Sequence, residues 1–364
     1  MPITVKSKKD KAGSTGTSMK SLLATFQKDL GEGIGNFGGA LIEHDRIPTG
    51  IFELDLAIGG GLPRGKCSII YGVESSGKTN AVLLAIANHQ KLWPDQTCAI
   101  VDLEHAFDPE WAQQLGVDTE KLMIVQPDYA EQAVDIVESL LMADDCGIVA
   151  LDSLAALVTT SELDSSAEKA VVGGAALVIG KLYRKTTHAL QTAAKAGRFP
   201  SLIYVNQVTT KIGVMFGDPE TTPGGNKPRF QSSLTIRLYG KNKTDPKVST
   251  TMPVLKETTF IIKKWKVPIK FNSGGYELVM VPHKGLSAGQ SDDFGTVAEY
   301  LKAWGDFKKA DKGQGWVIRG VEYKTIDEFK QLYYGDSAFG GAIRKYVIDT
   351  IMNDGELLVE GGAN

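Results

Sequence analysis

Apolar runs that end in polar residues recur along the middle of this chain, and segments of helical periodicity separate them. The runs are SIIYG, CAIVDLEH, GIVALDS and SLIYVNQ, and the segments between them include AVLLAIANHQKLW, EQAVDIVESLLM and VVGGAALVIGKLYRKTTHALQTAAKAG. Continuous apolar strands that alternate with crossover helices are typical of a parallel sheet covered on both faces. The sequence therefore predicts an α/β fold with a mostly parallel central sheet flanked by helices.

The same pattern predicts where polar side chains gather. Parallel sheets bind their ligands beyond the carboxyl ends of the strands. The four runs end at or next to Gly72, Glu104, Asp152 and Gln207. We expect these residues to converge at one edge of the sheet.

The pattern changes on both sides of this region. Residues 1–20 are rich in Lys, Ser, Thr and Gly and are expected to be disordered, whereas Leu22 to Leu30 have the apolar spacing of a short helix. Strand-like segments (SLTIRLYG, TTFIIKKWKV, GYELVMV) continue to about residue 282, and helical periodicity returns in DEFKQLYY and GGAIRKYVIDTIMN. We expect a tail and oligomerisation arm at 1–44, the core at 45–282 and a small α/β module at 283–364.

Composition and charge narrow the function classes. Of 364 residues, 42% are hydrophobic and 23% are charged, and no apolar run approaches the roughly 18 residues that cross a bilayer. The amino terminus lacks the apolar stretch of a secretory signal, so we expect a cytoplasmic protein without a membrane partner. Cys67, Cys98 and Cys146 are expected to be reduced core residues. The net charge of −3 weakens a nucleic-acid role without excluding it, because positive groups can gather on one surface.

Residues 67–79, CSIIYGVESSGKT, carry the strongest chemical signal. An apolar strand leads directly into glycines and then into Lys78 and Thr79, at the spacing of a phosphate-binding loop. Glycines let backbone amides close around phosphates, the lysine supplies a cation, and the threonine hydroxyl is a ligand for Mg²⁺. The alternative is a strand-to-helix turn that matches by chance. We predict a nucleoside triphosphate site at Gly72, Val73, Glu74, Ser75, Ser76, Gly77, Lys78, Thr79 and Asn80.

Two acidic residues follow other strands. Asp152 stands where phosphate-loop enzymes hold Mg²⁺ with a carboxylate, and the alternative is an aspartate that caps a turn. Glu104 is placed to orient or deprotonate an attacking water, which makes hydrolysis the expected reaction. Asp102 could exchange roles with it, and either could serve only as a cap.

Asp108 and Trp111 are candidates for the base of the nucleotide. Asp108 precedes Pro109 and Glu110, which is the signature of a helix start, so helix capping is the structural interpretation. The functional interpretation is that Asp108 accepts a hydrogen bond from the adenine amino group while Trp111 stacks on the ring. Packing of Trp111 on a neighbouring helix is the alternative.

The segment QVTTKIGVMFGDPETTPGGN, residues 207–226, is long and rich in glycine, proline and threonine. A loop of this length signals a function or disorder, and a lid over the site is one interpretation. In the other, Met215 and Phe216 wedge between bases while backbone amides and Lys211 or Arg229 meet phosphates. In this second interpretation the DNA contacts are Lys211, Ile212, Gly213, Val214, Met215, Phe216, Gly224, Gly225 and Asn226.

Strand alternation in TTFIIKKWKVPIK puts Lys264 and Lys266 on one face and Trp265 on the other. A solvated strand face is the ordinary fate of lysines. The functional interpretation is that the pair reaches the γ-phosphate of a neighbouring subunit, as an arginine finger does.

Together these residues resemble the RecA recombinase family. The similarity runs from LDLAIGGGLPRGK through GVESSGKT, VDLEHAFDPEW, VALDSLAAL and VNQVTTKIGVMFGDPETTPGGN to Phe230. The resemblance implies a RecA-type phosphate-loop ATPase core that uses ATP and Mg²⁺, forms helical filaments on single-stranded DNA and pairs it with homologous double-stranded DNA. Single-strand-binding and loader proteins would be accessory partners, and the location would be the nucleoid or a phage replication site.

The resemblance also implies a role for each matching position. Lys78 and Thr79 bind phosphate and magnesium, Asp152 belongs to the metal site, and Glu104 activates water. Trp111 takes the adenine-stacking place, Gln207 links the γ-phosphate to the DNA loop, and Phe230 packs at the subunit interface. Lys264 and Lys266 match the pair that reaches the adjoining nucleotide.

Three other functions use the same phosphate loop. A ring helicase or another RecA-core motor would unwind a forked duplex instead of pairing strands. A small-molecule kinase would need an acceptor pocket and no filament. A regulatory ATP-binding protein would bind without turnover, which the glutamate at position 104 makes less attractive.

Overall fold

The computed structural model describes residues 18–30, 45–165, 174–210, 220–223, 231–248, 251–283, 285–310 and 315–354. The chain divides into two compact units, residues 1–43 and 44–364. In the first, helix α1 (Met19–Leu30) confirms the predicted short helix. The predicted disorder of residues 1–20 falls almost wholly outside the described residues.

The central sheet of the second unit holds eight strands among the described residues, in the order β12-β11-β10-β3-β7-β6-β4-β5. The six strands from β10 to β5 run parallel, and β11 and β12 are antiparallel additions at one side. Their bounds are β3 (Cys67–Gly72), β4 (Thr97–Asp102), β5 (Leu122–Val125), β6 (Cys146–Asp152), β7 (Ser201–Gln207), β10 (Leu234–Lys243), β11 (Leu255–Trp265) and β12 (Ser273–Val279). The predicted mostly parallel α/β sheet is confirmed.

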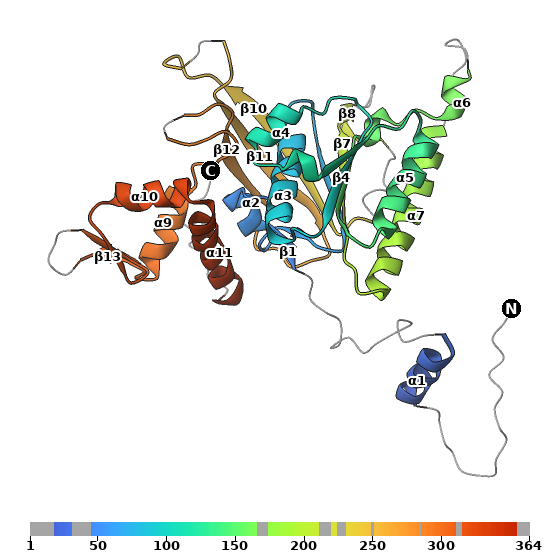
Figure 1. The fold of residues 1–364 in the computed structure, drawn as a ribbon, viewed down its shortest axis with the longest axis horizontal. Coiled ribbons are helices and arrows are strands. Elements are labelled where there is room, and N and C mark those ends of the chain that lie inside the picture. The colour runs from blue at the N-terminus through green and yellow to red at the C-terminus, as the bar shows by residue number, and fades with distance from the viewer. Residues whose placement is uncertain are drawn as a thin grey trace. The chain divides into compact units, whose positions relative to one another are not determined.

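Helices cover both faces of this sheet (Figure 1). One core packs α2 and α3 against it, and the other packs α5 and α7. Strands β3, β6 and β7 are buried almost throughout because both of their faces are covered, which is why they appear as continuous apolar runs. The helices and short elements of this region are β1 (Arg46–Ile47), α2 (Phe52–Ala57), β2 (Leu62–Pro63), α3 (Lys78–Leu92), α4 (Pro109–Gln114), a 3₁₀ turn (Thr119–Lys121), α5 (Ala130–Met142), a second 3₁₀ turn (Leu154–Ala156), α6 (Thr160–Leu163), α7 (Gly174–Lys195), β8 (Thr209–Thr210) and β9 (Glu220–Thr221).

The carboxyl-terminal segment contributes most of a third core, which it shares with α2 and β12. Three helices surround a small antiparallel sheet, and their apolar side chains pack with Phe52 and Leu56 of α2 and with Val279 of β12. The elements are α9 (Phe294–Ala303), β13 (Phe307–Lys309), β14 (Trp316–Ile318), β15 (Val321–Tyr323), α10 (Ile326–Gly335) and α11 (Ser337–Asp354). The predicted small α/β module is present, and its boundary at residue 283 stays a prediction.

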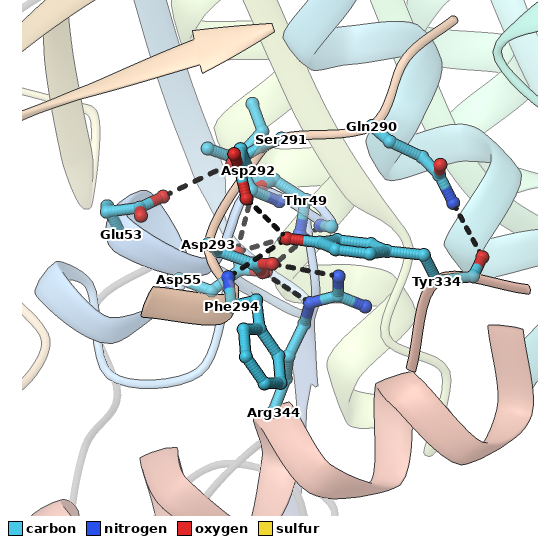
Figure 2. A network of polar contacts seen from close by, with 12 residues as sticks. Thr49, Glu53, Asp55, Gln290, Ser291, Asp292, Asp293, Phe294, Tyr334 and Arg344 are labelled. Atoms are coloured by element: carbon cyan, nitrogen blue, oxygen red, sulfur yellow. Dashed lines mark hydrogen bonds and ion pairs between the residues drawn. The ribbon is translucent and has the colours of Figure 1, made fainter. Parts of the chain in front are cut away.

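Polar contacts cluster where this module meets α2 of the core (Figure 2). Asp293, just before α9, is fully buried and pairs with Arg344 of α11, whose Nη2 donates to Asp293 Oδ1 at 3.1 Å. The neighbouring Ser291 Oγ donates to Glu53 Oε2 on α2 at 3.5 Å. We call these four residues the junction network.

Candidate functional site

The connection from β3 to α3 has the backbone of a phosphate-binding loop. Gly77, the residue before α3, has a φ of +93°, and Ser75 has a φ of +57°. A Cβ on Gly72 would lie 2.3 Å from Ser76 Oγ and 2.6 Å from the Leu238 carbonyl oxygen. Glycine is therefore required at 72 for close approach and at 77 for left-handed backbone. Of the other predicted phosphate contacts, Val73, Glu74, Ser75 and Thr79 are exposed, Asn80 is half-buried, and Ser76 is buried.

The Lys78 ammonium lies inside this loop. Its Nζ donates to the carbonyl oxygens of Val73 at 2.8 Å and Gly72 at 3.3 Å, and it forms no ion pair with the described residues. Burial lowers the pKa of Lys78, and the negative charges of Asp152 and Glu104 counter that shift only in part. A buried cation whose partners are neutral carbonyls is suited to an anionic ligand, so this loop fits a triphosphate.

Asp152, at the end of β6, accepts a hydrogen bond from Thr79 Oγ1 at 2.9 Å. Burial raises the pKa of Asp152 to about 6, and the nearby charge of Glu104 adds to the shift while the Thr79 bond opposes it. Hydroxyl and carboxylate oxygens side by side are ligands that Mg²⁺ prefers. Thr79 and Asp152 therefore fit a magnesium ion next to the phosphate loop.

Glu104 receives two donors on the same oxygen. Gln207 Nε2 at the end of β7 donates to Glu104 Oε1 at 2.9 Å, and Ser153 Oγ after β6 donates to that atom as well. Both of these bonds fall on Oε1, and Oε2 forms no hydrogen bond with the described residues. Residues from three strand ends are thus brought together, as the pattern predicted.

Asp102 serves a different purpose. It is buried, and its carboxylate accepts from the backbone amides of Ala106 at 3.3 Å and Phe107 at 3.2 Å and from Gln126 Nε2 at 3.1 Å. These bonds hold the turn that follows β4. The alternative in which Asp102 exchanges roles with Glu104 is therefore disfavoured by the geometry.

Gln207 connects Glu104 to the base of the long loop. The next residue, Val208, donates its amide to the Gly72 carbonyl at 3.2 Å, and β8 pairs with β9 directly after it. Asn206 Nδ2 donates to the Pro223 carbonyl at 3.3 Å across the base of the loop. The described parts of the loop, residues 207–210 and 220–223, are thus held together next to the phosphate site.

Asp108 and Trp111 lie at the start of α4. Asp108 Oδ1 accepts from the amides of Glu110 at 2.9 Å and Trp111 at 3.0 Å, which confirms that Asp108 caps α4. A contact of Asp108 with adenine stays a prediction. The Trp111 indole packs against the core and donates through Nε1 to Asn80 Oδ1 at 3.0 Å. Since Asn80 belongs to the phosphate loop segment, Trp111 lies beside that site, and its stacking on adenine stays a prediction.

Lys264 and Lys266 lie at the other edge of the sheet. Trp265 between them is in register with Leu234, which is in register with Ser68, four residues before Gly72. At about 3.3 Å per residue this is about 13 Å along β3 from the phosphate loop. Both lysines lie near Cys67, where burial raises the pKa of the thiol to about 12 and their charges oppose the rise.

The other predicted contacts fall outside the described residues. These are Lys211, Ile212, Gly213, Val214, Met215, Phe216, Gly224, Gly225 and Asn226 of the DNA loop, Arg229, and Phe230 of the predicted interface. They stay predictions.

One residue at the site had no signal in the sequence. Lys256 of β11 is buried and its Nζ donates to the Ser75 carbonyl at 2.6 Å, from a position 181 residues along the chain. The only hint is that strand alternation in LKETTFIIKKW places position 256 with the inward-facing side chains.

A phosphate loop at the carboxyl edge of a parallel sheet, with a carboxylate pair on adjacent strands, defines a nucleotide-binding α/β protein of the phosphate-loop class. Residues 17–286 match the family model described as the RecA N-terminal domain. The chain is 37% identical to Protein RecA of Bordetella avium over 84% of this chain and 85% of that relative. It is 38% identical to Protein RecA of Symbiobacterium thermophilum over 80% and 83%. Identity reaches 43% with Protein RecA of Saccharopolyspora erythraea over a shorter match, 61% of this chain and 63% of the relative.

The chain therefore belongs to the RecA family, as the resemblance predicted. Membership gives it the function of a recombinase in DNA repair that binds ATP and DNA. It also implies, in general terms, an ATPase with a magnesium-dependent nucleotide site and assembly into oligomers. None of the helices in the described residues has the length and apolar character needed to cross a bilayer.

Proposed function

We propose that this protein is a DNA-dependent ATPase that forms filaments on single-stranded DNA and exchanges it with a homologous duplex. The bond from Gln207 Nε2 to Glu104 Oε1 carries the proposal. It joins Glu104, the proposed base for the attacking water, to Gln207, the first residue of the proposed DNA loop. A change at the γ-phosphate would alter the partner of Gln207 and hence the loop that follows it. DNA held by that loop would act on Glu104 by the same route.

The residues of the site divide the chemistry among them. Loop amides and Lys78 bind the phosphates, and Thr79 with Asp152 holds Mg²⁺, which would stabilise charge on the phosphoryl oxygens. Glu104, held through Oε1, takes the proton of the attacking water at Oε2. Trp111 stacks on the adenine, and the exposed edge of Asp108 accepts from its amino group.

Lys264 and Lys266 serve the nucleotide of a second copy. Their place at the far edge of the sheet supports this, since about 13 Å of strand at about 3.3 Å per residue separates them from the phosphate loop of their own chain. A neighbour that presents this edge would add two cations to the γ-phosphate, as an arginine finger does. Turnover would then require adjoining subunits, with α1 and Phe230 at their interface.

Mixing two inactive variants tests this assignment. Glu104→Gln should bind ATP but hydrolyse it about 10²- to 10⁴-fold more slowly, because it removes the base. The double variant Lys264→Met and Lys266→Met should be similarly slow while its own site stays intact. A mixture on single-stranded DNA should exceed the summed rates of the two, since the first variant lends its lysines to the second.

Lys263→Met is the matched control, because Lys263 is an exposed lysine next to the pair. It should retain DNA-stimulated turnover. A mixture no faster than its components would refute action between subunits, and a rate indifferent to DNA would refute the coupling through Gln207. Assays of the wild-type protein for joint-molecule formation and for unwinding of a forked duplex separate a recombinase from a helicase.

A further inference from the structure

Two strands of the sheet support the back of the phosphate loop. A Cβ on Gly240 of β10 would lie 2.6 Å from Ser76 Cα, so the strand backbone touches the loop backbone there. A Cβ on Gly77 would lie 3.5 Å from Lys256 Cδ and 3.6 Å from Thr258 Oγ1, both on β11. The loop therefore packs against a wall formed by β10 and β11.

Lys256 is a buried charged residue of this wall, next to the loop. The residue is 6% exposed, and its Nζ donates to the Ser75 carbonyl at 2.6 Å. Burial lowers its pKa, with no acidic group offsetting the shift. By contrast Glu257, the next residue, faces solvent and pairs with Lys243 at 3.1 Å. A buried ammonium without an acidic partner among the described residues costs stability, so it calls for a compensating role.

We propose that Lys256 is a positioning residue that raises nucleotide affinity by holding the phosphate loop from behind. The inference rests on the proposed nucleotide site. The Ser75 carbonyl and the Ser76 amide belong to one peptide unit, and that amide donates to the Val73 carbonyl at 3.3 Å, so a cation at the Ser75 oxygen holds the orientation of this part of the loop. Its positive charge also lies in a poorly solvated region on the same loop that takes the negative phosphates.

This role predicts that one variant binds nucleotide more weakly without losing thermal stability. Lys256→Met keeps the length and packing of the side chain but removes the charge and the donor. The dissociation constants for ATP and ADP should both rise about tenfold, since a charge-assisted hydrogen bond at the loop is lost whichever nucleotide is bound. The turnover number at saturating ATP should change less than about twofold, because the contribution is the same in ground and transition states. The melting temperature without nucleotide should stay the same or rise, because a buried charge is gone.

Lys243→Met is the matched control, with the same charge change on the same pair of strands at an exposed position. Its nucleotide affinity should equal that of wild type. Lys256→Gln, which keeps a neutral donor, should fall between wild type and Lys256→Met. Calorimetric titration with ATP and with ADP, together with thermal unfolding, measures all three.

Two results would overturn the proposal. Unchanged affinity in Lys256→Met, with wild type binding ATP, would show that the charge does not act on the loop. A lower melting temperature that accompanies weaker binding would reduce Lys256 to a structural contact. Failure of wild type itself to bind ATP would instead defeat the proposed function, so the two failures are distinguishable.

Discussion

Buried charged groups occur both at the phosphate loop and at the junction network, but their partners differ. At the junction, the buried carboxylate of Asp293 has a guanidinium partner in Arg344. At the loop, the partners of Lys78 are carbonyl oxygens and that of Asp152 is a hydroxyl. The junction pair is satisfied by an opposite charge, whereas Lys78 and Asp152 have neutral hydrogen-bond partners, which is consistent with the proposed binding of a nucleotide and Mg²⁺ there.

The pKa shifts of Arg344, Lys78 and Asp152 follow this difference, whereas burial raises the pKa of Glu53 in the junction network to about 7. Burial alone would lower the pKa of Arg344, but the hydrogen bond and charge of Asp293 outweigh it and raise the pKa, which favours the charged form. Burial lowers the pKa of Lys78 and raises that of Asp152, which favours the neutral form of each. Burial thus disfavours the charged form of a group unless an ion pair compensates it.

The largest effect should come from breaking the junction pair. Arg344→Met leaves the fully buried Asp293 without its cation and should lower the free energy of unfolding by about 3–5 kcal/mol. Urea denaturation measures it. Adding Asp293→Leu should recover much of the loss, because the unpaired charge is then removed. ATP affinity measured well below the denaturation midpoint should not change, and a parallel loss would contradict the separation of the two regions.

At the nucleotide site, removing a charge should change the free energy of unfolding in the opposite direction. Asp152→Asn should raise the free energy of unfolding at pH 7 by about 1–3 kcal/mol, because it removes a carboxylate that burial disfavours. The same change should weaken Mg²⁺-dependent ATP binding. A stability loss of any size would place Asp152 with the paired charges of the junction.

The pH dependence follows from the same shift. The folded pKa of Asp152, about 6, lies above its ordinary 3.8, so its protonated form stabilises the fold below about pH 4, and this contribution is lost as the pH rises through about 6. The difference in stability between Asp152→Asn and wild type should therefore grow across that interval. Paired denaturation curves from pH 4 to 7, without Mg²⁺, measure it.

The part of this site that sequence could predict depends on strand direction. The carboxyl ends of four parallel strands lie at one edge of the sheet. The positions where the apolar runs end were therefore enough to predict that Glu104, Asp152 and Gln207 lie close to the phosphate loop. Sequence could not choose between Asp102 and Glu104. That choice depends on the turn after β4, whose amides Asp102 accepts.

Lys256 was beyond prediction for another reason. Its contact with Ser75 depends on how far β10 and β11 extend past the sheet edge and on their register, in which Lys256 lies opposite Asn242. Shifting that register by one residue would turn the side chain to solvent. The carboxyl-terminal module was predictable as helices and strands, but not the pairing of Asp293 with Arg344, which lie 51 residues apart.

The smallest effect is expected at two helix caps, one beside the nucleotide site and one in the carboxyl-terminal module. Asp108 accepts from the first amides of α4, and Thr325 accepts from the Glu328 amide at 3.1 Å in α10. Asp108→Ala and Thr325→Ala should each lower the free energy of unfolding by about 1 kcal/mol, since each helix loses a cap. Only Asp108→Ala should also reduce the preference for ATP over ITP, because ITP lacks the amino group that Asp108 is proposed to bind.

Competition binding of ATP and ITP to both variants measures that preference directly. If both variants lose the same stability and keep the wild-type preference, Asp108 is a cap like Thr325, and the base is selected elsewhere. If the preference falls in Asp108→Ala alone, one carboxylate performs both tasks. Its two capping bonds fall on Oδ1, which leaves Oδ2 for the base and makes the two tasks compatible in one bound state.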